Sequence, residues 1–258
     1  MKKLPGFLAF SVLALSANAL PAQAFSVAPS SMTDSEFNGL INSRQFTELF
    51  VAESRAGNGS LSSAERELGI NQPVLPVIGG GLPFPDAQGQ FAWGSNQPVD
   101  FVLSYDNTTG GISYQVADQT LTANVDPGSD PNSIFLRTRA QPKDTNTLSS
   151  SLILQSLLLT DDRETDTLPA LASFFTQGED PDIDYLVVSD VVGSFTLTGQ
   201  QVFSWEGTFP DRSRLATQFK VGTFNNVDPV PEPLTILGTA AAAGFGIVLK
   251  RRRAAQDS

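Results

Sequence analysis

The sequence predicts a mostly β protein: an antiparallel β-sandwich or jelly-roll-like domain with a short N-terminal helix, followed by a C-terminal transmembrane helix. Three observations support this. About eight to ten short segments between residues 99 and 224 alternate apolar and polar side chains, as half-buried strands do. Gly, Pro, Asn and Asp separate these segments at regular spacing. Residues 234–249 form an uncharged, apolar run of helix length near the C-terminus.

The N-terminus matches a secretory signal peptide over residues 1–24. Two lysines follow Met1, residues 4–20 are mostly apolar, and Ala22-Gln23-Ala24 supplies the small residues of a cleavage site. The alternative is an uncleaved anchor, which fits less well because the apolar run is short and ends at a proline. We therefore expect cleavage after Ala24, which leaves a β-rich extracytoplasmic domain over residues 25–228.

The first part of this domain contains the expected helix. Thr33 and Glu36 have the spacing of a capping box, and apolar residues follow at helical spacing, which predicts a helix over about 34–42. Residues 45–54 fit either a helix or a strand, and strand is preferred. A single helical turn is expected over 62–68. The Pro- and Gly-rich stretch 71–89 predicts a loop.

The rest of the domain alternates in the manner of strands, with turn residues between them. Residues 168–175 are expected to form a short helix or turn. The strand at 149–160 is expected to bulge near Gln155. The expected strands are 99–105, 112–117, 119–125, 133–140, 149–160, 186–192, 195–205 and 214–224.

Composition excludes several classes of function. The chain holds 16 basic and 27 acidic residues, of which 10 and 25 lie in residues 25–228, a net charge of −15 for the domain. Such a surface repels nucleic acid. The absence of histidine rules out a Ser-His-Asp triad and the usual zinc sites, and the absence of cysteine rules out disulfides. No catalytic motif is present, so we expect a protein that is not an enzyme and has no resident cofactor.

The densest acidic patch is a candidate calcium site. Asp180, Asp182 and Asp184 have the i, i+2, i+4 spacing that begins many calcium loops. Tyr185 stands where an EF-hand loop has its sixth-position glycine, and Val191 where it has its twelfth-position glutamate. A solvated acidic loop is therefore the preferred interpretation, with calcium as the alternative.

Aromatic side chains are candidates for stacking on sugars. Trp93 and Trp205 are the two tryptophans, and either could form part of a glycan-binding face. In a β-sandwich such residues more often belong to the core. The many carboxylates could also pair as in a glycoside hydrolase, but no motif selects a pair.

Residues 229–253 combine three features in order: Pro231-Glu232-Pro233, the apolar run 234–249, and Lys250 followed by Arg251-Arg252-Arg253. As a helix the apolar run would be about 24 Å long, a little short for a bilayer core but tolerable at modest cost. The cations favour a cytoplasmic C-terminus. An ordinary membrane anchor would have the same composition.

The order of these three features closely resembles the PEP-CTERM sorting signal of Gram-negative bacteria. That resemblance implies recognition by a membrane-embedded exosortase, a protease or transpeptidase that removes the tail near Pro-Glu-Pro. It also implies export to the cell surface or to an extracellular polysaccharide matrix, which makes the exosortase, the export machinery and that polysaccharide the expected partners.

The domain itself resembles the choice-of-anchor W domain of cyanobacterial exported proteins. The similarity is carried by residues 45–57, 64–69 and the hairpin 101–116, and would extend over 33–225. It implies no known activity. We expect an exported protein with a structural or interaction role. The alternatives are a lectin-like module, with or without calcium, and a carboxylate glycoside hydrolase.

Overall fold

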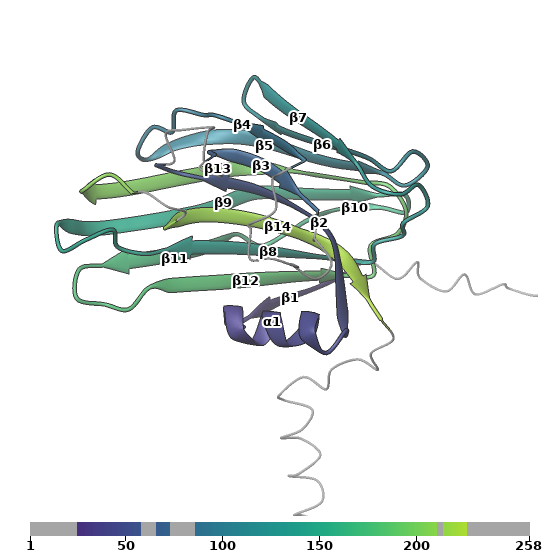
Figure 1. Cartoon of the computed structure of the whole chain (residues 1–258), viewed down its shortest axis with the longest axis horizontal. Helices are drawn as coiled ribbons and strands as arrows, with labels where there is room; N and C mark the ends of the chain where they lie inside the picture. Colours follow the sequence, from purple (N-terminus) through teal and green to yellow (C-terminus); the bar gives the residue numbers. More distant parts are fainter. Residues whose placement is uncertain (1–24, 58–65, 73–85, 211–213, 226–258) are drawn as a thin grey trace, which may run out of the picture.

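The structure is a computed structural model that describes residues 25–57, 66–72, 86–210 and 214–225 (Figure 1). These residues form two packed antiparallel sheets of seven strands each, with one short helix on the outside of one sheet. The predicted antiparallel sandwich with a short N-terminal helix is confirmed.

Sheet A carries the helix α1 (Asp34–Asn42) and has the strand order β1-β12-β8-β14-β2-β3-β4. Its strands are β1 (Ser26–Ser30), β2 (Phe46–Arg55), β3 (Leu68–Asn71), β4 (Ala87–Gly89), β8 (Ser133–Ala140), β12 (Asp182–Ser189) and β14 (Leu215–Phe224).

Sheet B has the order β10-β9-β13-β5-β6-β7, and β11 pairs with β9 beside β10. Its strands are β5 (Gln97–Asp106), β6 (Gly111–Val116), β7 (Gln119–Asn124), β9 (Thr147–Asp161), β10 (Thr165–Thr167), β11 (Leu171–Thr176) and β13 (Phe195–Gly207).

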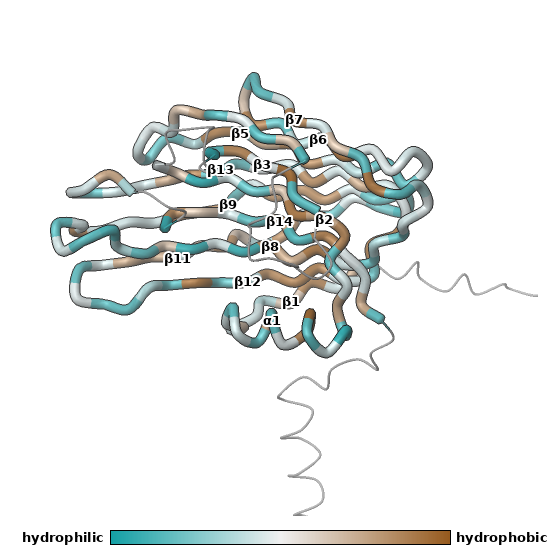
Figure 2. The backbone as a smooth tube through the Cα atoms, in the orientation of Figure 1, coloured by the Kyte–Doolittle hydropathy of each residue, from teal (hydrophilic) through white to brown (hydrophobic). Residues whose placement is uncertain are grey.

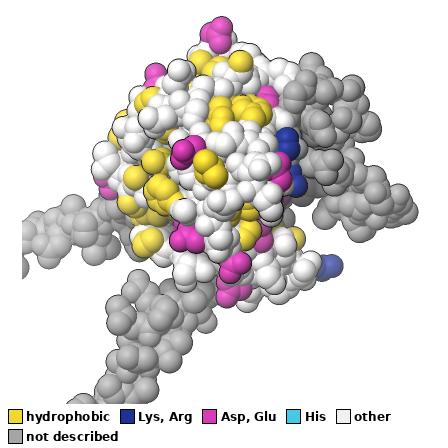
Figure 3. Space-filling model, turned by 90° about the vertical axis from the view of Figure 1, so that its left-hand side faces the viewer, with side chains coloured by type: hydrophobic (Ala, Val, Ile, Leu, Met, Phe, Trp, Pro, Cys, Tyr) yellow, Lys and Arg dark blue, Asp and Glu magenta, His cyan; other side chains and the backbone are white. Residues whose placement is uncertain are grey.

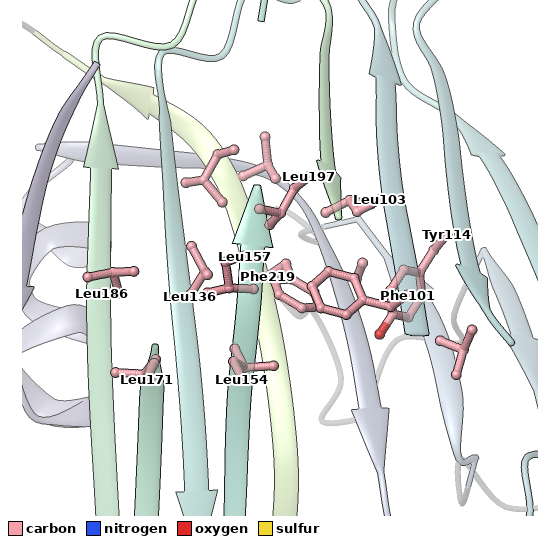
Figure 4. Packing of buried hydrophobic residues seen from close by; sticks show 14 of the residues in the cluster. Phe101, Leu103, Tyr114, Leu136, Leu154, Leu157, Leu171, Leu186, Leu197 and Phe219 are labelled. Atoms are coloured by element: carbon pink, nitrogen blue, oxygen red, sulfur yellow. The ribbon is translucent and has the colours of Figure 1, made fainter. Parts of the chain in front are cut away.

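The main core lies between the sheets, because alternate residues of each strand point inward. Figure 2 shows the resulting bands of hydrophobic residues along the strands. In the centre, Phe101 of β5 stacks on Phe219 of β14 with ring centroids 4.8 Å apart, and Tyr114 of β6 meets Phe219 edge-on at 5.9 Å (Figure 4). The domain has no cysteine, so burial of this kind must hold it together.

A second, smaller core lies under α1 on the outer face of sheet A. The helix begins with the predicted capping box, in which Thr33 and Glu36 bond each other's backbone. Phe37 is its buried residue, and the ring packs against Phe46, Phe135 and Tyr185. Sheet A is therefore covered on both faces at this end.

Most expected strands are confirmed, including the bulge near Gln155. Across β9 and β13 the register passes from Leu158 opposite Thr198 to Gln155 opposite Gln200. The extra residue is accommodated by Ser156, which has a φ of 53°. Gly199 lies opposite the bulge, where a Cβ atom would come within 2.6 Å of a Leu157 methyl group.

One expectation was wrong. The helix or turn expected at 168–175 is instead strand β11, whose inward residues alternate with outward ones against β9. The loop expected over 71–89 lies mostly outside the described residues, and at its two ends Asn71 closes β3 and Ala87–Gly89 form the short strand β4. Part of the helical turn expected at 62–68 lies outside the described residues, and where the chain is described Leu68 opens β3.

The signal peptide 1–24 and the sorting segment 229–253, with its transmembrane run 234–249, lie outside the described residues. Within the part that is described, no helix is both long and apolar enough to span a bilayer.

Candidate functional site

An aromatic hollow of about 610 Å³ opens beside the end of β13, on the chain that leads into β5. Phe91, Trp93 and Phe209 line it together with the polar side chains of Gln90 and Gln119. Aromatic faces combined with a few amide groups can bind a sugar ring, because the rings cover its apolar face and the amides bond its hydroxyls.

Trp93 forms the inner wall of this hollow and is only 7% exposed. Its ring lies against Phe203, with centroids 4.1 Å apart, and edge-on to Phe91 at 4.6 Å. The indole Nε1 is buried and has no hydrogen-bond partner among the described residues. Trp93 is therefore a core residue at the edge of the hollow, in agreement with the interpretation that sequence reasoning preferred.

Trp205 is half-buried and packs on the main core, and its backbone nitrogen donates to Ser95 Oγ at 3.1 Å. Its ring meets Phe209 at 90° with centroids 4.9 Å apart. The aromatic surface that a ligand could reach belongs to Phe209, 47% exposed, and to the half-buried Phe91. Sequence reasoning missed these two, because phenylalanine is frequent in this chain and nothing local distinguishes an exposed one.

A second hollow, of about 570 Å³, lies on the outer face of sheet B, where Ser and Thr side chains line it together with acidic and apolar ones. Six Ser and Thr residues stand opposite one another across six neighbouring strands. They are Thr165, Thr160, Thr196, Ser104, Ser113 and Thr122, in spatial order from β10 to β7. At about 4.8 Å per strand, this hydroxyl row extends about 24 Å.

Contacts within the hydroxyl row fix some of its members. The Thr160 and Thr165 hydroxyls are 2.9 Å apart, and those of Ser104 and Thr196 are 3.3 Å apart. A hydroxyl both donates and accepts, so a row of them can exchange hydrogen bonds with the hydroxyls of an extended sugar chain. Some strands that contribute to this row, such as β5 and β13, are far apart in the sequence and become neighbours only in the folded sheet. The local sequence could therefore not reveal the row.

Two carboxylates at the rim of this second hollow are held in their charged form. Hydrogen bonds from the side chain of Thr109 and the backbone of Thr108 lower the pKa of Asp106. Burial pushes the pKa of Asp161 upward, but backbone N–H groups of Arg163, Glu164 and Val192 outweigh it and lower the pKa. A glycosidase acid needs a raised pKa instead, so neither carboxylate suits that role.

The acidic patch, for which calcium binding was the alternative interpretation, divides between a turn and a strand. Asp180 is exposed in the turn before β12, whereas Asp182 and Asp184 lie on β12. Asp182 Oδ2 accepts from the Phe174 backbone nitrogen at 2.8 Å, and Asp184 Oδ2 accepts from Ser173 Oγ at 3.3 Å. Burial and the neighbouring Asp182 raise the pKa of Asp184.

Within the described ranges no cluster of three or more acidic side chains is arranged to hold a metal. Figure 3 faces the end of the sandwich where the β11–β12 turn lies, and there acidic side chains are scattered among hydrophobic ones while Lys and Arg gather along one side. Calcium binding therefore stays the alternative interpretation, and the spacing alone supports it.

No family model matches the sequence, and no curated protein matches it.

Proposed function

We propose that this chain is an exported protein of the cell surface or extracellular matrix, sorted by an exosortase-type system, with a structural or interaction role. The order of Pro231-Glu232-Pro233, apolar run and Arg251 to Arg253 carries the proposal. The fold is compatible with it, because a β-sandwich with an extensive apolar core lies between the two predicted terminal signals.

Intact mass and cell fractionation of the native protein test this proposal. A species that lacks residues 1–24 and the tail from near Pro231 onward, found at the surface or in the medium, is the expected result. The variant Glu232→Ala should accumulate in the membrane with its tail intact. The matched control Glu179→Ala removes one glutamate from an exposed turn and should be processed like the wild type. A wild-type membrane species that keeps Arg251 to Arg253 contradicts the exosortase route.

A second candidate function is binding of an extracellular polysaccharide, and two features favour it. The hydroxyl row offers a polar surface about 24 Å long, and the aromatic hollow offers the exposed ring of Phe209. Sandwich domains present such surfaces on rigid strands, which limits the entropy lost on binding.

Affinity electrophoresis of the purified domain in gels that contain the producing cell's own polysaccharide tests this second function. Ser104→Trp should block the hydroxyl row and Phe209→Ala should remove the exposed ring. Phe174→Ala is the matched control, because Phe174 is 56% exposed on β11, away from both hollows. Retardation that survives both variants, or that is lost equally in the control, contradicts binding at these surfaces.

A further inference from the structure

Phe25 is the first residue after the predicted signal-peptide cleavage site, and its backbone nitrogen lies 2.7 Å from Oε1 of Glu164. The side chain of Phe25 is 5% exposed and belongs to the main core. The next residue, Ser26, opens β1 and pairs with Ser189 of β12. Ring burial on one side and strand pairing on the other therefore fix the position of the nitrogen.

The backbone of Glu164 is held by hydrogen bonds in the turn between β9 and β10. Asp161 Oδ1 accepts from the backbone nitrogens of Arg163 at 2.8 Å and Glu164 at 3.0 Å, and the Asp161 nitrogen donates to the Glu164 carbonyl at 2.9 Å. This turn belongs to sheet B, whereas β1 is an edge strand of sheet A. The contact between Phe25 and Glu164 therefore ties the two sheets together at one end of the sandwich.

We propose that Glu164 is the binding site for the α-ammonium group that signal-peptide cleavage creates on Phe25. The inference rests on the proposed export, since it needs cleavage after Ala24. Hydrolysis breaks the Ala24–Phe25 amide bond with one water molecule. The water oxygen goes to the new Ala24 carboxylate, and the Phe25 amine takes up protons to become an ammonium group. Cleavage thus converts a neutral amide donor facing Glu164 into a cation.

The charges around this position favour a cation. The turn carries Asp161, Asp162 and Glu164 together with Arg163, and Asp190 follows the end of β12. The Arg163 guanidinium is occupied by Asp161 Oδ2 and the Asp190 carbonyl. The acidic groups outnumber the one cation, so an added positive charge reduces repulsion. The bond to Glu164 is already charge-assisted at its acceptor before cleavage, and a charged donor adds the attraction between two opposite charges.

A double-mutant cycle on the mature domain, ending at residue 228, tests the inference. Four proteins are needed: the domain starting at Phe25, the same domain retaining Gln23 and Ala24, and the E164Q variant of each. Adding the two residues should lower the melting temperature by about 2–4 °C when Glu164 is present. In the E164Q background the same addition should have little effect, because the carboxylate that recognises the charge is gone.

The coupling between the N-terminus and Glu164 should also depend on pH. A free α-amino group titrates near pH 7.7–8.0, and a carboxylate partner favours its charged form in the folded state. The added stability is therefore fully present below about pH 7.5 and is lost as pH rises through the folded-state pKa. We expect a coupling at pH 6.5 that disappears by about pH 10.5.

Asp166→Asn is the matched control, since it removes a charge from the adjacent strand β10, where the Asp166 carboxylate accepts from the backbone nitrogen of Thr167. The inference is overturned if the N-terminal extension lowers the melting temperature equally in wild type, E164Q and D166N. It is also overturned if the coupling persists at high pH. These proteins have defined N-termini, so the result is independent of where the cell cuts. The mass of the native protein tests cleavage separately.

Discussion

The hydroxyl oxygen of Tyr114 lies 2.6 Å from Ser54 Oγ, and this contact joins the two sheets in the middle of the apolar core. Tyr114 belongs to β6 of sheet B and Ser54 to β2 of sheet A. Gln201 Nε2 donates to the same phenol oxygen at 2.9 Å. All three side chains are fully buried, so each hydrogen bond replaces a lost contact with water.

Tyr114→Phe should destabilise the domain by about 1–3 kcal/mol. The ring would keep its packing on Phe219, but Ser54 and the Gln201 amide would lose their partner in a place that water does not reach. Urea unfolding measures the effect. Ser113→Ala on the outward face of the same strand should change stability by less than about 0.5 kcal/mol, and equal losses in the two variants would show that Tyr114 acts through packing alone.

How far the sequence predicts this fold is illustrated by Tyr114 itself. Its alternation with Ile112 and Val116 predicts an inward-facing residue of a strand, and that is confirmed. The alternation cannot identify Ser54, which lies 60 positions earlier in the chain and is brought near only by the packing of two sheets. The hydroxyl row was missed for the same reason, since it exists only in the register between strands.

Strand β11 shows how tertiary structure can override a local pattern. Its inward residues are Leu171, Ser173 and Phe175, and its outward Phe174 is 56% exposed. The polar Ser173 thus occupies a buried position and the large apolar Phe174 an exposed one. The alternation of apolar and polar residues is therefore not recognisable in the sequence. Ser173 is tolerated inside because its hydroxyl lies 2.8 Å from that of Thr138 on the opposite sheet.

Two glycine substitutions should have opposite effects. Gly39 lies inside α1, and a Cβ atom there would meet nothing within 4 Å. Gly39→Ala should therefore stabilise the domain by about 0.5–1 kcal/mol, because alanine loses less backbone entropy in a helix. Gly222 lies at the bulge between β14 and β2, where a Cβ atom would approach the Thr47 carbonyl oxygen to 2.2 Å and Phe46 Cζ to 2.6 Å.

Gly222→Ala should therefore lower the free energy of unfolding by about 3 kcal/mol, because the new Cβ atom would clash in part with backbone that cannot move independently. Thermal unfolding of the two variants beside the wild type measures both effects. A Gly222→Ala protein as stable as the wild type would mean that the bulge relaxes freely.

Asp34 should contribute stability that depends on pH. Burial raises its pKa, but hydrogen bonds from Arg137 and Tyr185 outweigh that effect, so the pKa is lowered overall. Arg137 Nε and Nη2 donate to the two carboxylate oxygens at 2.7 and 2.6 Å, and the Tyr185 hydroxyl donates at 2.7 Å. These bonds attach the first turn of α1 to β8 and β12.

We expect Asp34→Asn to cost about 1 kcal/mol at pH 7, a modest value because the carboxylate is partly exposed and screened by solvent. A lowered folded-state pKa gives stability that is present above about pH 4 and is lost as pH falls. The difference between Asp34→Asn and wild type should therefore shrink between pH 5 and pH 2. The control Asp118→Asn, in the exposed β6–β7 turn, should show no such trend, and a constant difference for Asp34→Asn would contradict the ion pair.

Asp184 should behave in the opposite way, because burial and the charge of Asp182 raise its pKa. The folded state then binds its proton more tightly than the unfolded state, so stability falls as pH rises through about 4. Asp184→Asn keeps an oxygen that can accept from Ser173 but removes the charge. The variant should be more stable than wild type at pH 7, by up to about 1 kcal/mol after screening, and no more stable at pH 3.

The same pair of proteins tests calcium binding, the alternative interpretation of this acidic patch. A cation that binds Asp182 and Asp184 would neutralise their repulsion and stabilise the folded state in proportion to its concentration. Thermal unfolding at pH 7 with millimolar calcium should raise the melting temperature of the wild type and leave that of Asp184→Asn unchanged if the site exists. If calcium shifts the melting temperature equally in the two proteins, or in neither, then Asp182 and Asp184 do not form a calcium site. The acidic residues around β12 would then be solvated.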